Sequence, residues 1–155
     1  MKLPVDVLAE RYQNNIYSAA FNICRNPQDA EDVVQETFLK YYCIHKDFED
    51  EEHIRAWLLR VAINKAKNQV LSFWHKNKQA LDDYIETLAF ETPESEDLFE
   101  TVMMLPEKMR IVIHLFYYED YSVKEIARIL KISESNVKVR LNRGRELLKG
   151  KLKEE

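Results

Sequence analysis

Apolar residues recur at spacings of three and four along most of this 155-residue chain, and no stretch keeps the strict alternation of a β-strand. Because an α-helix completes a turn in 3.6 residues, this period predicts amphipathic helices. We expect helices at about 4–25, 27–44, 52–75 and 95–105, from Pro106 onward, and twice within 121–153. Only two glycines and four prolines also favour helices over a turn-rich β protein. The predicted fold is therefore all-α.

The first three helices carry enough apolar surface to form one bundle. Asn26-Pro27 separates the first helix from the second, and a polar run at 45–52 separates the second from the third. The helix that starts at Pro106 is apolar on two sides, which is typical of a helix buried between neighbours. Its stripes are Met109, Val112, Ile113 and Phe116 on one side and Ile111, Leu115 and Tyr118 on the other.

The stretch 121–153 predicts two capped helices joined by a tight turn. Ser122 followed by Glu125 forms a capping-box pattern, Lys131 and Ile132 make the turn, and Ser133 is placed to cap the second helix. The second helix has one apolar stripe, formed by Val137, Leu141, Gly144 and Leu148. This arrangement is a helix-turn-helix.

The positive charge of the second helix indicates a possible function for this helix pair. Seven basic and two acidic residues give 133–153 a net charge of +5, so the rest of the chain carries −9 within a total of −4. A basic helix on an acidic protein favours local contact with nucleic acid over a merely solvated helix. Ser133, Ser135 and Asn136 are candidates for phosphate oxygens, Lys138, Arg140 and Arg143 for phosphates or guanine edges, Asn142 for adenine and Val139 for a thymine methyl group.

A long acidic stretch precedes the second half of the chain. No basic residue occurs from Gln79 to Glu107, whereas nine acidic ones do. We predict a linker at 77–95, between a helical domain at 1–76 and a helix-turn-helix domain at 96–155. The linker is either a flexible solvated connector or an acidic strand that imitates nucleic acid in a partner's basic channel.

Catalytic chemistry is missing from the sequence. The four histidines show no metal-binding spacing, and two glycines cannot build a phosphate loop. Cys24 and Cys43 are expected to be buried thiols of a reducing compartment rather than a disulfide. Neither a signal peptide nor a membrane-spanning run is present. We expect a cytoplasmic protein that is no enzyme and needs no cofactor or metal.

A second candidate surface lies on the helix at 29–42, DAEDVVQETFLKYY. Phe38, Leu39, Tyr41 and Tyr42 surround this helix and offer more apolar surface than one core face needs. Some of these side chains should be exposed, which predicts a protein interface.

The same residues carry a family resemblance. DAEDVVQETFLKYY resembles the second conserved region of extracytoplasmic-function (ECF) sigma factors, and the segment at 105–149 resembles their fourth region. HIRAWLLRVAINKAKN, at 53–68, is similar to the helix between them. The two motifs occur in the order and spacing of that family, over about 8–76 and 95–152.

The resemblance implies a dissociable subunit of bacterial RNA polymerase that recognises promoters. It assigns core polymerase binding to Asp29, Asp32, Gln35, Glu36 and Leu39. It assigns −10 element contacts to Trp57, Arg60, Asn64, Lys65 and Asn68, with capture of a flipped base near 45–53. The helix-turn-helix would read the −35 element and the linker would run near the RNA exit path. An anti-sigma factor is a further expected partner.

The sequence departs from the family pattern in three respects. Lys131 stands where the turn usually has glycine, which predicts a left-handed backbone with its steric cost. Asn68 replaces an acid and Leu71-Ser72 a basic pair, which weakens the expected −10 surface. Gly144 replaces an alanine and softens its helix by about 1 kcal/mol.

Two other functions stay open on the sequence alone. One is a stand-alone helix-turn-helix regulator that dimerises through its N-terminal bundle. The other is a sigma-like interaction protein that binds polymerase without opening promoters, which the lost basic pair at Leu71-Ser72 favours.

Overall fold

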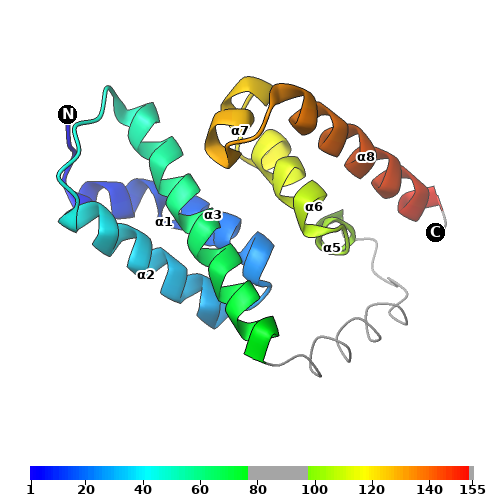
Figure 1. The fold of residues 1–155 in the computed structure, drawn as a ribbon, viewed down its shortest axis with the longest axis horizontal. Helices are drawn as coiled ribbons and strands as arrows, with labels where there is room; N and C mark the ends of the chain where they lie inside the picture. Colours follow the sequence, from blue (N-terminus) through cyan, green and yellow to red (C-terminus); the bar gives the residue numbers. More distant parts are fainter. Residues whose placement is uncertain (77–97, 154–155) are drawn as a thin grey trace. The chain divides into compact units, whose positions relative to one another are not determined.

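The computed structural model describes residues 1–76 and 98–153, and every element within these ranges is a helix (Figure 1). The predicted all-α fold is confirmed. The chain divides into two compact units, Met1–Val70 and Leu71–Glu155. The acidic linker predicted at 77–95 lies outside the described residues, so the domain boundaries on either side of it stay predictions.

The first unit contains α1 (Val5–Cys24), α2 (Pro27–Cys43) and most of α3 (Glu51–Lys76). The predicted break at Asn26-Pro27 folds α2 back onto α1. Arg25 ends α1 in the left-handed conformation, with φ 59°. The Asn26 side chain accepts a hydrogen bond from the Asp29 N–H at 3.0 Å, and Pro27 begins α2. An amide cap with proline in the first turn is a strong start signal for a helix.

An aromatic cluster forms one end of this unit's core. Phe48 is only 1% exposed, and its ring centroid lies 5.8 Å from those of Tyr41 and Trp57. Tyr41 donates a hydrogen bond to the Leu3 carbonyl oxygen at 2.7 Å, and burial raises the pKa of this phenol. The loop predicted at 45–52 is irregular only as far as 50, because α3 begins at Glu51. The loop is also not merely polar, because Phe48 holds it against the bundle.

A polar clasp joins α1 to the first turn of α3. Glu51 Oε1 accepts hydrogen bonds from Arg11 Nη1 at 2.5 Å and from Tyr12 Oη at 2.8 Å. Burial and the bond to Glu51 raise the pKa of Tyr12 to about 12. The bonds from Tyr12 and Arg11 lower the pKa of Glu51. Asp50 also caps α3, accepting from the His53 N–H at 2.8 Å.

The two cysteines form no disulfide, but their predicted burial is wrong. Cys24 is half-buried, and Cys43 is exposed at the last position of α2. The apolar period of α2 ends on Tyr41, which fills the core. Two further residues turn the helix by about 200°, so Cys43 faces away from α1.

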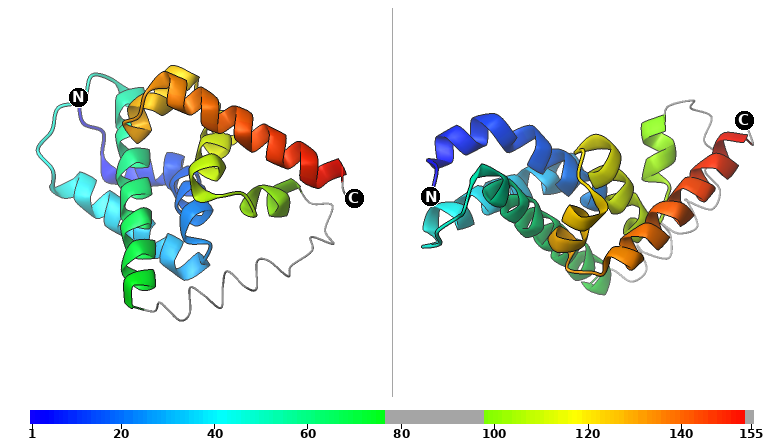
Figure 2. Two further views of the ribbon diagram at one scale, coloured as in Figure 1. Left: turned by 45° about the vertical axis from the view of Figure 1, so that its right-hand side comes forward. Right: turned by 90° about the horizontal axis from the view of Figure 1, so that it is seen from above.

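The second unit contains α5 (Leu98–Met103), α6 (Glu107–Ile113), the π-helix η1 (His114–Tyr118), α7 (Val123–Leu130) and α8 (Glu134–Lys153). Within this unit α6 and α8 lie against each other (Figure 2). Buried side chains from α5, α6, η1, α7 and α8 and from the turn after α5 form its core, among them Val102, Leu105, Ile111, Ile113, Leu115, Ile126, Val137 and Leu141.

The helix predicted from Pro106 does not stay regular. It widens into a π turn, closed by a 3.2 Å bond from the Glu119 N–H to the His114 carbonyl. A π turn holds an extra residue, so side chains beyond it leave the 3.6-residue stripe. Ile111 and Leu115 are buried as predicted, but Tyr118 is 49% exposed and that part of the prediction is wrong.

Gly144 marks a close approach of α8 to α6. A Cβ at this position would stand 3.1 Å from Ile113 Cγ1 and 3.3 Å from Ile113 Cδ1. Ile113 is buried and β-branched, so it has little freedom to move away. Gly150, six residues further along α8, has no atom within 4 Å of the corresponding Cβ. The chain thus offers one crowded and one open glycine in the same helix.

Substitution by alanine is predicted to change the stability differently at these two glycines. Gly150→Ala should raise the free energy of unfolding by about 0.5–1 kcal/mol, because alanine loses less backbone entropy in a helix. Gly144→Ala gains the same propensity, but crowding against Ile113 should cancel most of it or reverse its sign. Urea unfolding of both variants measures the difference. Equal stabilisation by the two changes would show that Ile113 yields freely.

The Glu51 clasp predicts a pH-dependent contribution to stability. In the folded chain the pKa of the Glu51 carboxyl lies below the ordinary value of 4.5. The stability that the clasp contributes is therefore present above pH 4.5 and is lost as the pH falls through the folded pKa. Glu51→Gln should be less stable than the parent at pH 7, and the gap should close below about pH 4.5. Thermal unfolding across this range tests it, with Glu10→Gln as the control for a lost charge. A gap that is constant with pH would contradict the clasp.

Candidate nucleic-acid and protein interfaces

The predicted helix-turn-helix is confirmed in α7 and α8, down to its caps. Ser122 Oγ accepts from the Glu125 N–H at 3.1 Å, and Glu125 Oε1 accepts from the Ser122 N–H at 3.3 Å, which completes a capping box. Ser133 Oγ accepts from the Asn136 N–H at 3.1 Å and caps α8. Both helices therefore start where the sequence predicts.

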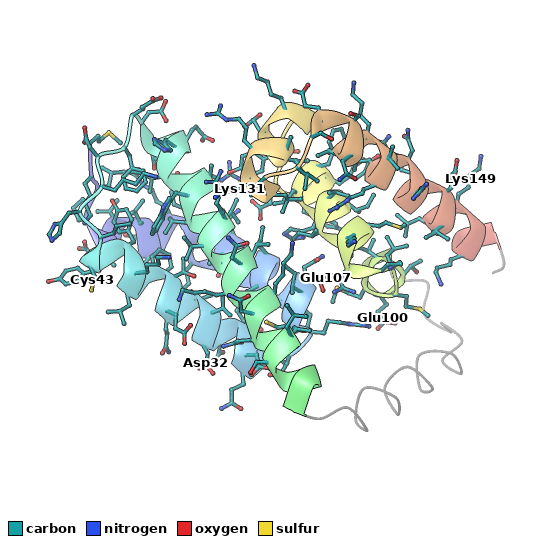
Figure 3. All side chains as sticks on the ribbon, in the orientation of Figure 1. Asp32, Cys43, Glu100, Glu107, Lys131 and Lys149 are labelled. Carbon is teal, nitrogen blue, oxygen red and sulfur yellow. The ribbon has the colours of Figure 1, made fainter. Side chains whose placement is uncertain are left out.

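The turn between them has the predicted left-handed residue. Lys131 has φ 58° and ψ 47°, and the Ile132 N–H donates to the Ala127 carbonyl at 3.1 Å. A left-handed lysine is less favourable than glycine by about 1 kcal/mol. The side chain of Lys131 is exposed (Figure 3). Lysine therefore makes the backbone conformation less favourable here but adds a positive charge to the surface.

One side of α8 is buried and the other faces solvent. Val137, Leu141 and Gly144 are buried, and Leu148 is half-buried. Among the predicted −35 contacts, Arg140 is half-buried, and its Nε donates to Asn136 Oδ1 at 3.2 Å. The other predicted contacts are exposed, namely Ser133, Ser135, Asn136, Lys138, Val139, Asn142 and Arg143. The structure thus gathers the predicted residues on the outer side of a single helix.

Further basic residues, missed in the sequence, lie on α7. Lys124, Arg128 and Lys131 are exposed and are spaced by four and three residues, so they share one side of the first helix of the hairpin. In helix-turn-helix proteins this helix crosses the DNA backbone. The sequence carries this signal as a helical period of cations, which lies before the basic segment 133–153 from which the DNA contact is predicted.

On α2 the structure gathers the residues predicted to bind polymerase. Asp29, Asp32, Gln35, Glu36 and Leu39 are all exposed and follow one side of the helix; Figure 3 labels Asp32. Leu39 is 63% and Tyr42 70% exposed, whereas Phe38 and Tyr41 are buried. The expectation that some of these apolar side chains are exposed is confirmed.

The residues predicted to contact the −10 element differ in how far they are exposed to solvent. Trp57 is 8% exposed, with its ring edge-on to Tyr41 and Phe48. Its position favours support of the 45–50 segment over direct contact. Arg60 and Lys65 are half-buried, and Asn64 and Asn68 are exposed. Lys65 Nζ lies 3.6 Å from Glu36 Oε2 on α2, so the two predicted surfaces share an ion pair.

The position of the missing basic pair is a solvent-facing turn. Leu71 is 66% exposed, and Ser72 is exposed as well. Asn64, Asn68 and Leu71 are spaced by four and three residues, so they form an uncharged stripe along α3. Among the residues predicted to contact the −10 element, Arg60 and Lys65 are the cations.

Within the described ranges, 1–76 and 98–153, no helix is long and apolar enough to cross a membrane. Nor do these residues include a group of three or more His, Cys, Asp or Glu side chains placed to hold a metal ion.

Family models match both units. Sigma-70 region 2 matches residues 8–80, and sigma-70 region 4 matches residues 95–148. Among curated proteins, the chain is 30% identical to the ECF RNA polymerase sigma factor SigM of Bacillus subtilis, over 95% of this chain and 94% of that protein. It is 31% identical to the ECF RNA polymerase sigma-E factor of Haemophilus influenzae, over 97% and 88%.

Two solved structures have a similar fold. One is the sigma factor RpoE in complex with the anti-sigma factor NepR from Bartonella quintana, with a TM-score of 0.70, 21% identity and 96% coverage of both chains. The other is CnrH in complex with the cytosolic domain of CnrY, with a TM-score of 0.68, 26% identity and coverage of 97% of this chain and 88% of that one.

Proposed function

We propose, since this chain belongs to the extracytoplasmic-function family of RNA polymerase sigma factors, that its two units divide promoter recognition between them. As a family member the chain is a transcription initiation factor, which binds RNA polymerase and promoter DNA. The chemistry it performs is recognition, and the polymerase supplies the catalysis. Its place of action is the cytoplasm, where bacterial polymerase and chromosome meet.

The observation that carries the proposal is the outward side of α8. Its buried stripe leaves Lys138, Asn142 and Arg143 exposed on one capped helix. This is the arrangement a recognition helix needs, because base edges are reached only by side chains that leave the protein surface. We assign the −35 element to this side of α8 and the adjacent DNA backbone to the basic residues of α7.

The first unit is proposed to bind core polymerase and the −10 element. On α2 the exposed acids and Leu39 form a surface suited to a basic and partly apolar site on core polymerase. On α3, Arg60, Asn64, Lys65 and Asn68 are the residues proposed to face the −10 element. Trp57 is better explained as the support of the loop at 45–50, beside which a flipped base would be held. The uncharged turn at Leu71 weakens backbone attraction on this side.

The charge distribution explains why polymerase is needed. The chain carries −4 overall, and only 133–153 is strongly basic. Free protein therefore gains little non-specific attraction to DNA. Once α2 docks on polymerase, α8 is delivered to the promoter at a high effective concentration. We include an anti-sigma factor among the partners. One similar solved structure is a complex with the anti-sigma factor NepR, and the other is a complex with the cytosolic domain of CnrY.

Run-off transcription tests the proposal. Purified chain and core polymerase are mixed with a genomic promoter library, and promoter-specific transcripts are expected only when both proteins are present. Polymerase binding without any specific transcript would favour an interaction protein that opens no promoter. DNA binding by the free chain at a palindromic site would favour a stand-alone regulator.

The α2 surface predicts a charge-dependent dock. Asp32→Arg should weaken binding to core polymerase by at least about tenfold, because the reversed charge meets a basic site. Glu31→Arg is the matched control: it makes the same charge change on the neighbouring residue, about 100° around the helix. Co-purification with core polymerase and titration of labelled chain measure both. Equal losses for the two variants would mean net charge, not this surface, governs docking.

The α8 surface predicts a local effect on DNA binding. Arg143→Ala should weaken −35-dependent binding of the holoenzyme and lower the slope of log K against log salt by about 1 if the lost contact is to phosphate. Lys149→Ala removes the same charge from an exposed position near the end of α8 and serves as control. Unchanged affinity and slope for Arg143→Ala would reject the assignment.

A further inference from the structure

An arginine outside the predicted contact set is held by aromatic side chains. The Nε of Arg145 on α8 donates a hydrogen bond to Tyr117 Oη at 2.7 Å, although the two residues lie 28 positions apart. The Arg145 guanidinium carbon also lies 5.4 Å from the Phe116 ring centroid and 5.5 Å from that of Tyr117. Cation–π attraction and a hydrogen bond therefore fix this guanidinium against the π-helix η1.

The fixed guanidinium in turn contacts Asn142. Arg145 Nη1 donates to Asn142 Oδ1 at 3.3 Å, one helical turn away. Since a guanidinium has donors only, the amide atom that faces it must be the oxygen. The amide nitrogen of Asn142 is then directed to the other side. The terminal torsion of an asparagine is broad and roughly two-fold, so a single contact of this kind removes an otherwise easy flip.

This orientation matters for reading bases. In the major groove adenine, guanine and thymine all present an acceptor, whereas cytosine presents only the N4 donor. An amide that is free to flip can meet either kind of edge and discriminates poorly. An amide that keeps its N–H₂ group forward accepts adenine, guanine or thymine and rejects cytosine. Adenine is favoured most, because its amino group can still reach the second lone pair of Oδ1.

We propose that Tyr117 and Arg145 are positioning residues that hold the Asn142 amide for base readout and make its −35 contact exclude cytosine. The inference rests on the proposed function of α8 as the −35 reader. Tyr117 acts through Arg145 and does not itself touch DNA. Its hydroxyl is the acceptor that keeps the guanidinium turned toward Asn142.

The experiment uses holoenzyme assembled from the full chain and core polymerase. The probe is a promoter duplex whose −35 positions are each replaced in turn by all four bases. Tyr117→Phe keeps the ring over Arg145 and removes only the acceptor. It should reduce discrimination against cytosine at one position by about twofold to tenfold, which is the worth of a single hydrogen bond. Affinity for the best sequence, the salt slope and the melting temperature should change little.

Two comparisons separate positioning from general support. Tyr118→Phe removes the hydroxyl of the neighbouring exposed tyrosine, whose ring stacks on His114 rather than on Arg145. It should leave the base preferences unchanged. In an Asn142→Ala background Tyr117→Phe should have no further effect at that position, because the side chain that it positions is gone.

The outcomes are distinct. Loss of preference at one position in Tyr117→Phe, absent from Tyr118→Phe and from the Asn142→Ala background, supports the inference. Even weakening at all positions, or a change in salt slope, would overturn it in favour of structural support or of direct phosphate contact by Arg145. An effect of Asn142→Ala without one of Tyr117→Phe also overturns it but leaves the proposed function standing. A wild-type holoenzyme without any −35 preference would instead reject the proposed function.

Discussion

The packing of α8 against α6 determines which side chains of the second unit can meet another molecule. Val137, Leu141 and Gly144 are buried, and at Gly144 the two helices approach so closely that a Cβ would stand 3.1 Å from Ile113. A contact this tight allows one rotational setting of α8 about its axis, because a turn in either direction would drive a larger side chain into α6. The exposed positions of α8 therefore follow from its buried ones. Core packing thus orients the proposed recognition surface as a whole, and the contact of Arg145 with Asn142 adds the orientation of one side chain.

Much of this arrangement was predictable because it depends on local rules. The 3.6-residue period predicted the helices, and the caps at Asn26, Ser122 and Ser133 are hydrogen bonds between residues three positions apart. Outward candidates such as Lys138 and Arg143 followed from subtracting the apolar stripe. Each of these inferences uses only neighbours in sequence.

The missed features depend on partners far away in the chain. Phe48 looks like one apolar residue in a polar loop, and its burial comes from Tyr41 and Trp57 on two helices. The same cluster buries Trp57 to 8% exposure, and its predicted contact with the −10 element stays a prediction. Arg145 counts in the sequence only as one more cation, whereas its position is set by Tyr117 on a π turn. No local pattern predicts that turn, because it is a defect in a period that otherwise continues.

The first unit shows how binding to polymerase and to DNA can be linked at low cost. Glu36, on the proposed polymerase side of α2, is paired with Lys65, on the proposed DNA side of α3, at 3.6 Å. Glu36 is half exposed in this pair, and such exposed pairs contribute only about 0–1 kcal/mol. A basic group on polymerase that takes over Glu36 therefore loses little by breaking the pair. Lys65 is then left without its acid beside an α3 stripe, Asn64, Asn68 and Leu71, that carries no charge of its own. The sequence of α3 also contains Arg55, Arg60 and Lys67, so the released lysine adds one cation to those already on this helix. The expected consequence is a modest rise in the affinity of α3 for DNA when α2 is occupied, which favours polymerase binding before promoter binding.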